Sequence, residues 1–552
     1  MNRLHAVATF ASLCAGTAAA QGLFPFQIQA LVKEGDVVAG VGAVTTINNL
    51  AINDLADWLV QADTNQADTN TDEVMLRSGL LYLREGDPLA APAGATIGSF
   101  DAVNLSNSGH SAWNIFIDNT GSTSTDSAVF YDTTLQIQES TIATASGFSA
   151  GTPYIGWFEV KPNDTGSYLM VASVDDVAIT STVDRALVLG VPSGGGPPAE
   201  AVLWKEGDVL PGQIEFAADF GTGPHTFAIN DTLQVLFFAD LNGDTTKDGV
   251  LYLGTSILAQ EGSASPIAGR NWLSLSSAVV DLNDAGDTAF TGSLDGDAAT
   301  NVILIRNGQK LAQEGDTLPA IAPFKLTGFG SAPIQIDAAG NVLWFGDWDD
   351  PDTTRDTGLF LNGDLLVQEG VTTIGGVVLQ TLAGVQNAFS MSDDGRFILF
   401  EGALTGSIDG AFLISPAGSV TAIPGCVGNA GTLALASGTP SIGQPFTLAS
   451  DVAQVSGALS FVGAAGGLIA PGPCGVSLPG LGEVFLGLSP APLVVGGGPW
   501  SGAPVSFALA LPSSIELVGA NVYFQGLFLD LAVGAVEPVR LTNGLDMRIG
   551  GP

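Results

Sequence analysis

The acidic residues between positions 240 and 248 have the types and spacing of a calcium-binding loop. Asp240, Asn242, Asp244 and Asp248 offer the oxygen ligands that Ca²⁺ prefers. The glycine at position 243 comes earlier than the sharp turn of such a loop requires, and no glutamate closes the site. Asp and Asn are also ordinary residues of solvated turns. The segment therefore indicates either a divalent-cation site, with Ca²⁺ as the expected cofactor, or plain loop chemistry.

A second acidic loop surrounds a tryptophan. Asp347, Trp348 and Asp349 lie in the run DWDDPD, where Trp348 is the tryptophan best placed to be exposed and to stack on a sugar. The other tryptophans lie in apolar patterns typical of a core. Paired carboxylates also cleave glycosidic bonds. The loop is therefore a candidate binding surface, and a carbohydrate-active hydrolase or lyase is the alternative to a non-enzymatic binding protein.

The N-terminal residues have the features of an export signal. Residues 1–20 combine Arg3, an apolar stretch and a run of small residues ending at Ala20. We expect cleavage before Gln21, and no later stretch is long and apolar enough to span a membrane. The chain is therefore predicted to be secreted or displayed at the cell surface.

Two cysteines remain after this cleavage. Cys426 and Cys474 both lie near the C-terminus, and an exported chain favours a disulfide between them over two free thiols.

A Glu-Gly step, usually followed by Asp, divides the chain into similar units. The glutamates, with a degenerate copy at Glu139, are 51, 54, 67, 55, 53 and 55 residues apart: Glu34, Glu85, Glu139, Glu206, Glu261, Glu314 and Glu369. Seven units therefore fit between the export signal and Pro424. We expect the glutamates to be mainly structural, with carboxylates that accept backbone N–H bonds.

Each unit also contains an Asn-Asp-x-Gly turn followed by an alternating apolar run, as in LNDAGDTAF at 282–290. Asn, Asp and Gly tolerate positive φ, so the turn is expected to join two strands as a hairpin. A second tight turn, such as NGQ at 307–309, precedes the next Glu-Gly step. Each unit therefore reads as a four-stranded antiparallel sheet.

Lone sheets of this kind leave apolar faces exposed, so neighbouring units must stack on one another. The predicted fold is all-β: a β-propeller of seven four-stranded blades over residues 21–424. The strand QIQALVK at 27–33 precedes the first unit and is expected to close the ring with a blade from the far end. An open array of sheets, or six or eight blades, are the alternatives.

The repeat resembles that of secreted bacterial tandem-repeat proteins named for an NxxGxxxF motif. The pattern runs from Asn283 to Phe290, with looser copies from Asp337 to Trp344 and from Asp393 to Phe400, and the EGD spacing is similar. The unit at Glu139 lacks the glycine after glutamate, and Asp231 is followed by no glycine. The resemblance implies export and a repeat fold, but no defined activity.

The composition changes at Gly425 to Gly, Pro, Leu, Val and Ala with few charges. Short alternating or apolar segments separated by turn residues predict a β-sandwich over residues 425–552. It is similar to C-terminal β-domains of exported bacterial proteins, for which attachment is suspected. A stabilising cap is the alternative role.

The net charge of −39 excludes nucleic acid as a partner and attracts cations or basic proteins. In the predicted sheets, the long loops and the Glu-Gly crossovers share one acidic face, which is the expected ligand face. The sequence therefore favours a non-enzymatic binding or structural protein, whose partner is a cell-surface component, a polysaccharide or a basic protein.

Overall fold

The computed structural model describes residues 25–101, 103–179, 184–194, 196–453, 457–470, 472–530, 532 and 538–551. The predicted export signal, residues 1–20, lies outside the described residues. The described chain divides into two compact units: one is Ile28–Leu413, and the other begins at Ile414 and includes the residues up to Gln27. No helix in the described part of the chain is long and apolar enough to cross a membrane.

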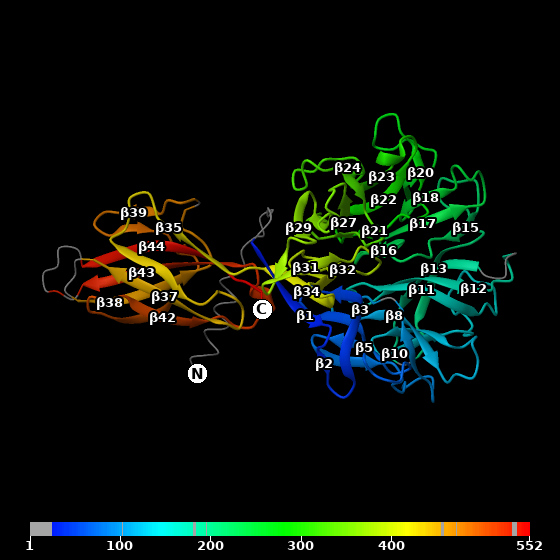
Figure 1. Cartoon of the computed structure of the whole chain (residues 1–552), viewed down its shortest axis with the longest axis horizontal. Coiled ribbons are helices and arrows are strands. Elements are labelled where there is room, and N and C mark those ends of the chain that lie inside the picture. The colour runs from blue at the N-terminus through cyan, green and yellow to red at the C-terminus, as the bar shows by residue number, and fades with distance from the viewer. Residues whose placement is uncertain are drawn as a thin grey trace. The chain divides into compact units, whose positions relative to one another are not determined.

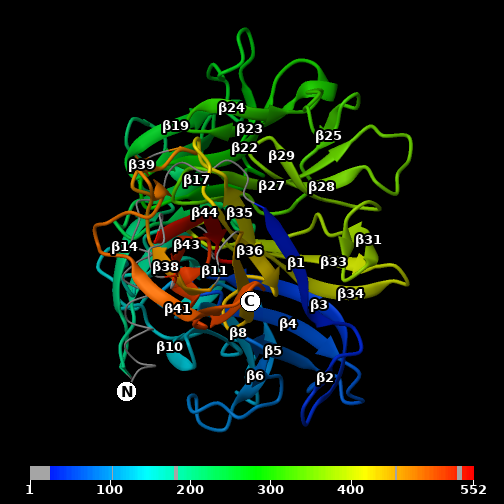
Figure 2. The ribbon, with the colours of Figure 1, turned by 90° about the vertical axis from the view of Figure 1, so that its left-hand side faces the viewer.

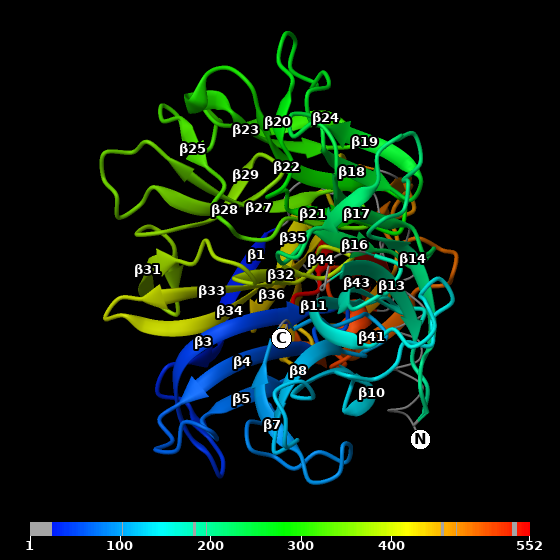
Figure 3. The ribbon, with the colours of Figure 1, turned by 90° about the vertical axis from the view of Figure 1, so that its right-hand side faces the viewer.

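The first unit is a ring of seven antiparallel sheets, numbered here in the order of their second strands along the chain (Figure 3). Sheet 1 contains β2 (Val37–Val38), β3 (Gly42–Ile52), β4 (Trp58–Thr64), β5 (Glu73–Arg77) and β6 (Leu80–Arg84). Sheet 2 contains β7 (Thr96–Phe100), β8 (Ala112–Asp118), β9 (Ser127–Tyr131) and β10 (Thr134–Gln138). Sheet 3 contains β11 (Tyr154–Pro162), β12 (Tyr168–Val174), β13 (Asp184–Val191) and β14 (Ala199–Lys205).

Sheets 4 to 6 have an inner edge divided between two short strands. Sheet 4 contains β15 (Ala217–Phe220), β16 (Phe227–Ile229), β17 (Val235–Leu241), β18 (Gly249–Leu253) and β19 (Ser256–Gln260). Sheet 5 contains β20 (Trp272–Ser274), β21 (Val280–Leu282), β22 (Thr288–Leu294), β23 (Val302–Arg306) and β24 (Gln309–Gln313), with the 3₁₀ turn η1 (Ala298–Thr300) before β23. Sheet 6 contains β25 (Leu326–Gly328), β26 (Gln335–Ile336), β27 (Val342–Trp348), β28 (Thr357–Leu361) and β29 (Asp364–Gln368).

Sheet 7 is assembled from both ends of the ring. It contains β30 (Thr373–Ile374), β31 (Val377–Leu382), β32 (Phe389–Met391), β33 (Ile398–Leu404), β34 (Ile408–Pro416) and the N-terminal strand β1 (Phe26–Lys33). Strand β1 pairs with β34, as the sequence predicted for residues 27–33. The fold is therefore a seven-bladed β-propeller whose ring is closed by strand pairing.

Neighbouring sheets bury their apolar faces against each other. Between sheets 5 and 6, Leu304 packs in one cluster with Trp344 and Phe360, whose rings are stacked with centroids 4.5 Å apart. All three side chains are buried. Burial of this apolar surface is the main force that holds one sheet on the next.

The Glu-Gly-Asp step is a crossover in which each residue has a separate role. Glu314 Oε2 accepts the N–H of Val302, Gly315 has a φ of +84°, and Asp316 Oδ2 accepts the N–H of Gln313. Glycine suits the left-handed backbone at the middle position. In the degenerate copy, Ser140 adopts the same conformation with a φ of +66°. The prediction that the Glu314 carboxylate accepts a backbone N–H bond is confirmed.

The Asn-Asp-x-Gly turn caps itself and joins one sheet to the next. Asn283 Oδ1 accepts the N–H of Asp287 in its own turn, while Asn283 Nδ2 donates to the carbonyl of Asp337 in sheet 6. The first residue of each turn is called the capping residue below: Asn53, Ser106, Asn163, Asn230, Asn283, Asp337 and Ser392. Asparagine suits both roles because its amide carries the acceptor and the donor on separate atoms, so one side chain reaches its own turn and the next sheet together.

The C-terminal strands, yellow to red in Figures 1 and 2, form one curled sheet with strand order β41-β38-β43-β44-β36-β37-β42. Their bounds are β36 (Gly431–Ser437), β37 (Pro445–Val452), β38 (Ala458–Ala465), β41 (Leu493–Trp500), β42 (Val505–Ala510), β43 (Asn521–Asp530) and β44 (Val539–Arg548), beside the hairpin β39 (Val476–Leu478) and β40 (Gly482–Val484) and the 3₁₀ turn η2 (Ile515–Leu517). Phe446 of β37 meets Phe524 of β43 edge to face, so strands that are not neighbours in the sheet pack against each other. A β-sandwich domain over residues 425–552 stays a prediction.

Strand β35 (Ser419–Ile423) pairs with β44, so this short segment before Gly425 belongs to the C-terminal sheet. The Cys426–Cys474 disulfide is present, with Cα atoms 5.2 Å apart, as predicted.

Candidate functional site

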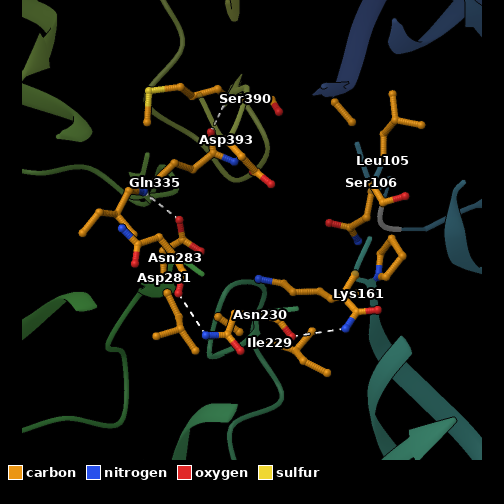
Figure 4. A pocket seen from close by; sticks show the side chains of 18 of the residues that line it. Leu105, Ser106, Lys161, Ile229, Asn230, Asp281, Asn283, Gln335, Ser390 and Asp393 are labelled. Carbon is orange, nitrogen blue, oxygen red and sulfur yellow. Dashed lines mark hydrogen bonds between the residues drawn. The ribbon is translucent and has the colours of Figure 1, made fainter. Parts of the chain in front are cut away.

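A cavity of about 170 Å³ lies on the axis of the propeller and is lined by residues from all seven sheets (Figure 4). One lining residue in each sheet stands two positions before the capping residue. We call these the column residues: Ala51, Asn104, Lys161, Ala228, Asp281, Gln335 and Ser390. Because all seven hold the same place in the repeat, the fold brings them to the same cavity.

Hydrogen bonds between sheets fix three column residues. Asp281 Oδ2 accepts the N–H of Ile336, and Ser390 Oγ accepts the N–H of Ile52. Gln335 Oε1 accepts the N–H of Met391. Each side chain is therefore oriented by the inner strand of the next sheet.

The mouth of the cavity is ringed by the residues that follow the capping residues, here called the girdle. They are Asp54, Asn107, Asp164, Asp231, Asp284 and Ala338, with Asp393 and Asp394 in sheet 7, where the turn is one residue longer. Asp164, Asp231, Asp284, Ala338 and Asp393 line the cavity, and hydrogen bonds connect Asp54, Asn107 and Asp394 to this ring. Backbone N–H groups donate from one girdle residue to the side chain of the next, as from Asp164 to Asp231 at 2.8 Å. The link from Asp394 to Asp54 at 2.9 Å joins the last sheet to the first.

The inner end of the cavity is closed by two residues that meet across the axis. His225 Nε2 lies 2.8 Å from Asn387 Oδ1, although the two residues belong to sheets 4 and 7. Asn387 Nδ2 donates in turn to Asn49 Oδ1 at 2.8 Å. Both His225 and Asn387 have left-handed backbones, with φ of +58° and +60°. Burial lowers the pKa of His225 to about 4, so its ring is neutral at pH 7.

A buried carboxylate stands behind this floor. Glu159 Oε2 accepts the N–H of His225, and Glu159 Oε1 lies 3.5 Å from Lys161 Nζ. Lys161 points into the cavity (Figure 4). Burial raises the pKa of Asp281 to about 6, and the positive charge of Lys161 opposes this rise. The inner part of the site therefore combines the Lys161 ammonium with two acidic side chains, those of Glu159 and Asp281.

The carboxylates at the mouth repel one another. Burial and the charge of Asp394 raise the pKa of Asp54 to about 6. Asp393 keeps exposed surface in the mouth, yet the surrounding protein and the charge of Asp54 raise its pKa well above the usual range. Among the charged residues that line the cavity, only Lys161 is a cation.

The predicted calcium residues lie at the opposite ends of the strands: Asp240 is near the end of β17, and Asn242, Asp244 and Asp248 are in the long loop between β17 and β18. Asp240 and Asp248 line a second, more open pocket together with Asp219 and Glu261. Burial and the charge of Asp248 raise the pKa of Asp240.

The other two predicted ligands turn away from that pocket. Asn242 Oδ1 accepts the N–H of Phe216, and the Asp244 carboxylate accepts hydrogen bonds from Thr246. No group of three or more His, Cys, Asp or Glu residues in the described ranges is arranged to hold a metal ion. Ca²⁺ binding stays a prediction.

The prediction that Trp348 is exposed is wrong. Only 2% of its surface is accessible, and its ring packs edge to face on Phe360 with centroids 5.9 Å apart. The in-and-out alternation of side chains along β27 continues as far as Trp348. Its side chain therefore points into the core, although its neighbours in the sequence are acidic. Asp349 Oδ1 accepts the N–H of Lys325, and burial raises the pKa of Asp347. This loop therefore offers no indole for sugar stacking.

The column residues were missed by reasoning from the sequence, although a signal exists. Aligning the units on their capping residues shows one position that alternates among Ala, Asn, Lys, Asp, Gln and Ser inside otherwise apolar strands. Polar residues at a fixed place in buried strands indicate a lined cavity.

A family model described as a family of unknown function (DUF7453) matches residues 188–365. No curated protein matches the chain. Solved structures similar to the chain include the Trypanosoma rangeli sialidase in complex with the inhibitor DANA, with 10% identity, a TM-score of 0.28, and coverage of 95% of this chain and 97% of that chain. Another is the polysaccharide lyase Uly1, with 11% identity, a TM-score of 0.28, and coverage of 74% and 95%. At these scores the two likenesses carry no argument about function.

Proposed function

We propose that this protein is a non-catalytic binding protein of the cell exterior that takes a small polar ligand in the axial cavity. The observation that carries the proposal is the convergence of the seven column residues, one from each sheet, on one enclosed space. Sites of this kind combine apolar walls with a few oriented polar groups.

The orientation of the polar groups supports binding. Asp281 and Ser390 are each held by a backbone N–H of the next sheet, so little side-chain entropy is lost when a ligand arrives. The closed floor at His225 and Asn387 favours a ligand that enters and leaves through the same mouth.

A mouth-blocking variant tests the proposal. Ala338 is exposed and lines the cavity, so Ala338→Trp places a large ring over the mouth without disturbing the core. Ala339 is the next residue, is also exposed and is not part of the lining, so Ala339→Trp is the matched control.

The ligands for this test are glucose, glucuronate and glucosamine, which share a ring and differ in charge. We expect at least one of them to raise the melting temperature of the natural chain and of Ala339→Trp, but not that of Ala338→Trp. Equal shifts in both variants would show that the ligand binds elsewhere. Release of sugars from a polysaccharide by the natural chain would favour the hydrolase or lyase alternative instead.

A further inference from the structure

We infer that the ligand of the axial cavity is a small amine that also carries hydroxyl groups, the chemical class of the amino sugars. The inference rests on the proposed function and adds the identity of the ligand class.

The first argument is the excess of negative charge. Five aspartates line the cavity against one ammonium, that of Lys161: Asp164, Asp231, Asp281, Asp284 and Asp393. Asp393, whose pKa is raised well above the usual range, is the most readily protonated of them, and the other four still outnumber the ammonium. Glu159 already lies beside that ammonium, at 3.5 Å. The remaining negative charge favours a cationic ligand, because enclosed walls strengthen its attraction.

The second argument separates an organic cation from a metal ion. The five carboxylates come from four different sheets, and no three acidic groups in the described residues are close enough to share a metal ion. A metal ion needs its oxygen ligands in one tight shell. An ammonium on a larger molecule suits dispersed acceptors, since the rest of the molecule spans the cavity.

The third argument concerns donors that lack acceptors. Ser390 is 8% exposed and lines the cavity; its Oγ accepts the N–H of Ile52, and its own hydroxyl hydrogen has no acceptor in the described residues. Gln335 uses its carbonyl oxygen for Met391, which leaves its amide NH₂ without an acceptor in the same part of the chain. The buried hydroxyl of Ser390 needs a partner, and the half-buried amide of Gln335 can gain one; hydroxyl oxygens of a ligand provide both.

Apolar side chains complete the walls. Ile229, Ile336 and Phe389 line the cavity between the polar groups and suit the carbon skeleton of a compact ring. The carboxylates therefore suit the amine of such a ligand, the column donors suit its hydroxyl groups, and the apolar walls suit its carbon skeleton.

Isothermal titration calorimetry of the full chain at pH 7 tests the inference with the same three hexoses. We expect glucosamine to bind with a Kd at least tenfold lower than that of glucose, and glucuronate to bind more weakly than both. Asp281→Asn keeps the acceptor for Ile336 and removes the charge, so it should weaken glucosamine binding at least tenfold and change glucose binding little.

Asp297→Asn is the matched control, because Asp297 is an exposed carboxylate in the long loop of the same sheet. Should Asp281→Asn fail to fold, Ser390→Ala replaces it and should weaken both glucosamine and glucose severalfold. Equal affinities for glucose and glucosamine, or a preference for glucuronate, would overturn the inference and leave the proposed function intact. No glucosamine binding would also overturn it, whereas the proposed function fails only if Ala338→Trp blocks no ligand.

Discussion

His225 and Asn387 meet across the axis of the propeller, with Nε2 and Oδ1 2.8 Å apart, although 162 residues separate them in the chain. Their sheets are not neighbours in the ring, so this contact forms only when the ring is closed. It gives the cavity its floor and ties sheet 4 to sheet 7 through a side chain.

Removing this contact should destabilise the propeller. In Asn387→Ala, His225 and Asn49 both lose a partly buried hydrogen-bond partner, and we expect the free energy of unfolding to fall by about 2 kcal/mol. Urea denaturation measures the change. The control is Asn119→Ala, since Asn119 also has a left-handed backbone, with a φ of +63°, but is exposed. Equal losses in the two variants would mean that backbone conformation, and not the axial contact, is responsible.

Leu233→Gly should stabilise the chain. Leu233 occupies the glycine position of its turn with a φ of +61°. Because 46% of its surface is exposed, burial of its side chain offsets little of this backbone strain. Relief of the left-handed strain predicts a gain of about 1 kcal/mol in the free energy of unfolding. The reverse change, Gly286→Ala, should cost about as much, because Gly286 has a φ of +86° in the next sheet. A stabilised Gly286→Ala would refute this account of the turn.

The amide of the capping asparagine should be worth more than a hydroxyl. Asn283→Ser retains an acceptor for its own turn but loses the bond from Nδ2 to the carbonyl of Asp337. We expect a loss of about 1 kcal/mol, measured by chemical denaturation. Asn271→Ser in the same sheet changes an exposed side chain and should cost much less.

Stability should increase as the pH falls from 8 to 6. Burial raises the pKa of Glu401 to about 8 and the pKa values of Glu85 and Glu206 to about 7. These groups bind protons more tightly in the folded chain, so the folded state gains stability as the pH falls through these values. His225 acts in the opposite direction, but only below its unfolded pKa of about 6.5.

Calorimetry of the full chain should therefore show a melting temperature for the propeller that is about 2–4 °C higher at pH 6 than at pH 8. Glu401→Gln should reduce this difference, because it removes the group with the highest pKa of the three. A melting temperature that falls over this range would contradict the assigned directions.

Reduction of the disulfide should affect the C-terminal unit alone. Cys426 and Cys474 are 48 residues apart, and the loss of such a cross-link costs about 2–4 kcal/mol. Calorimetry with and without a reducing agent should show one transition lowered and the propeller transition unchanged. A shift of both transitions would show that the two units unfold together.

The repeat made the fold predictable. The Glu-Gly steps and the turn residues are local signals, and the pairing of β1 with β34 followed from the likeness of residues 27–33 to the last strand of a unit. Trp348 was placed wrongly because acidic neighbours suggested a loop, whereas strand alternation decides where a side chain points. The cavity could not be predicted from single residues, since Lys161 and Asp281 come to line one cavity only after seven sheets close around an axis.

Hydrogen–deuterium exchange with and without glucosamine, glucose and glucuronate tests the central claim most directly, because it separates the two ends of the propeller. The account predicts slower exchange with glucosamine in peptides that contain the column and girdle segments 228–231, 281–284 and 390–393, and no change in the long loops at 240–248 and 347–352. Protection of those long loops with unchanged cavity peptides, or no protection by any of the three sugars, would contradict it.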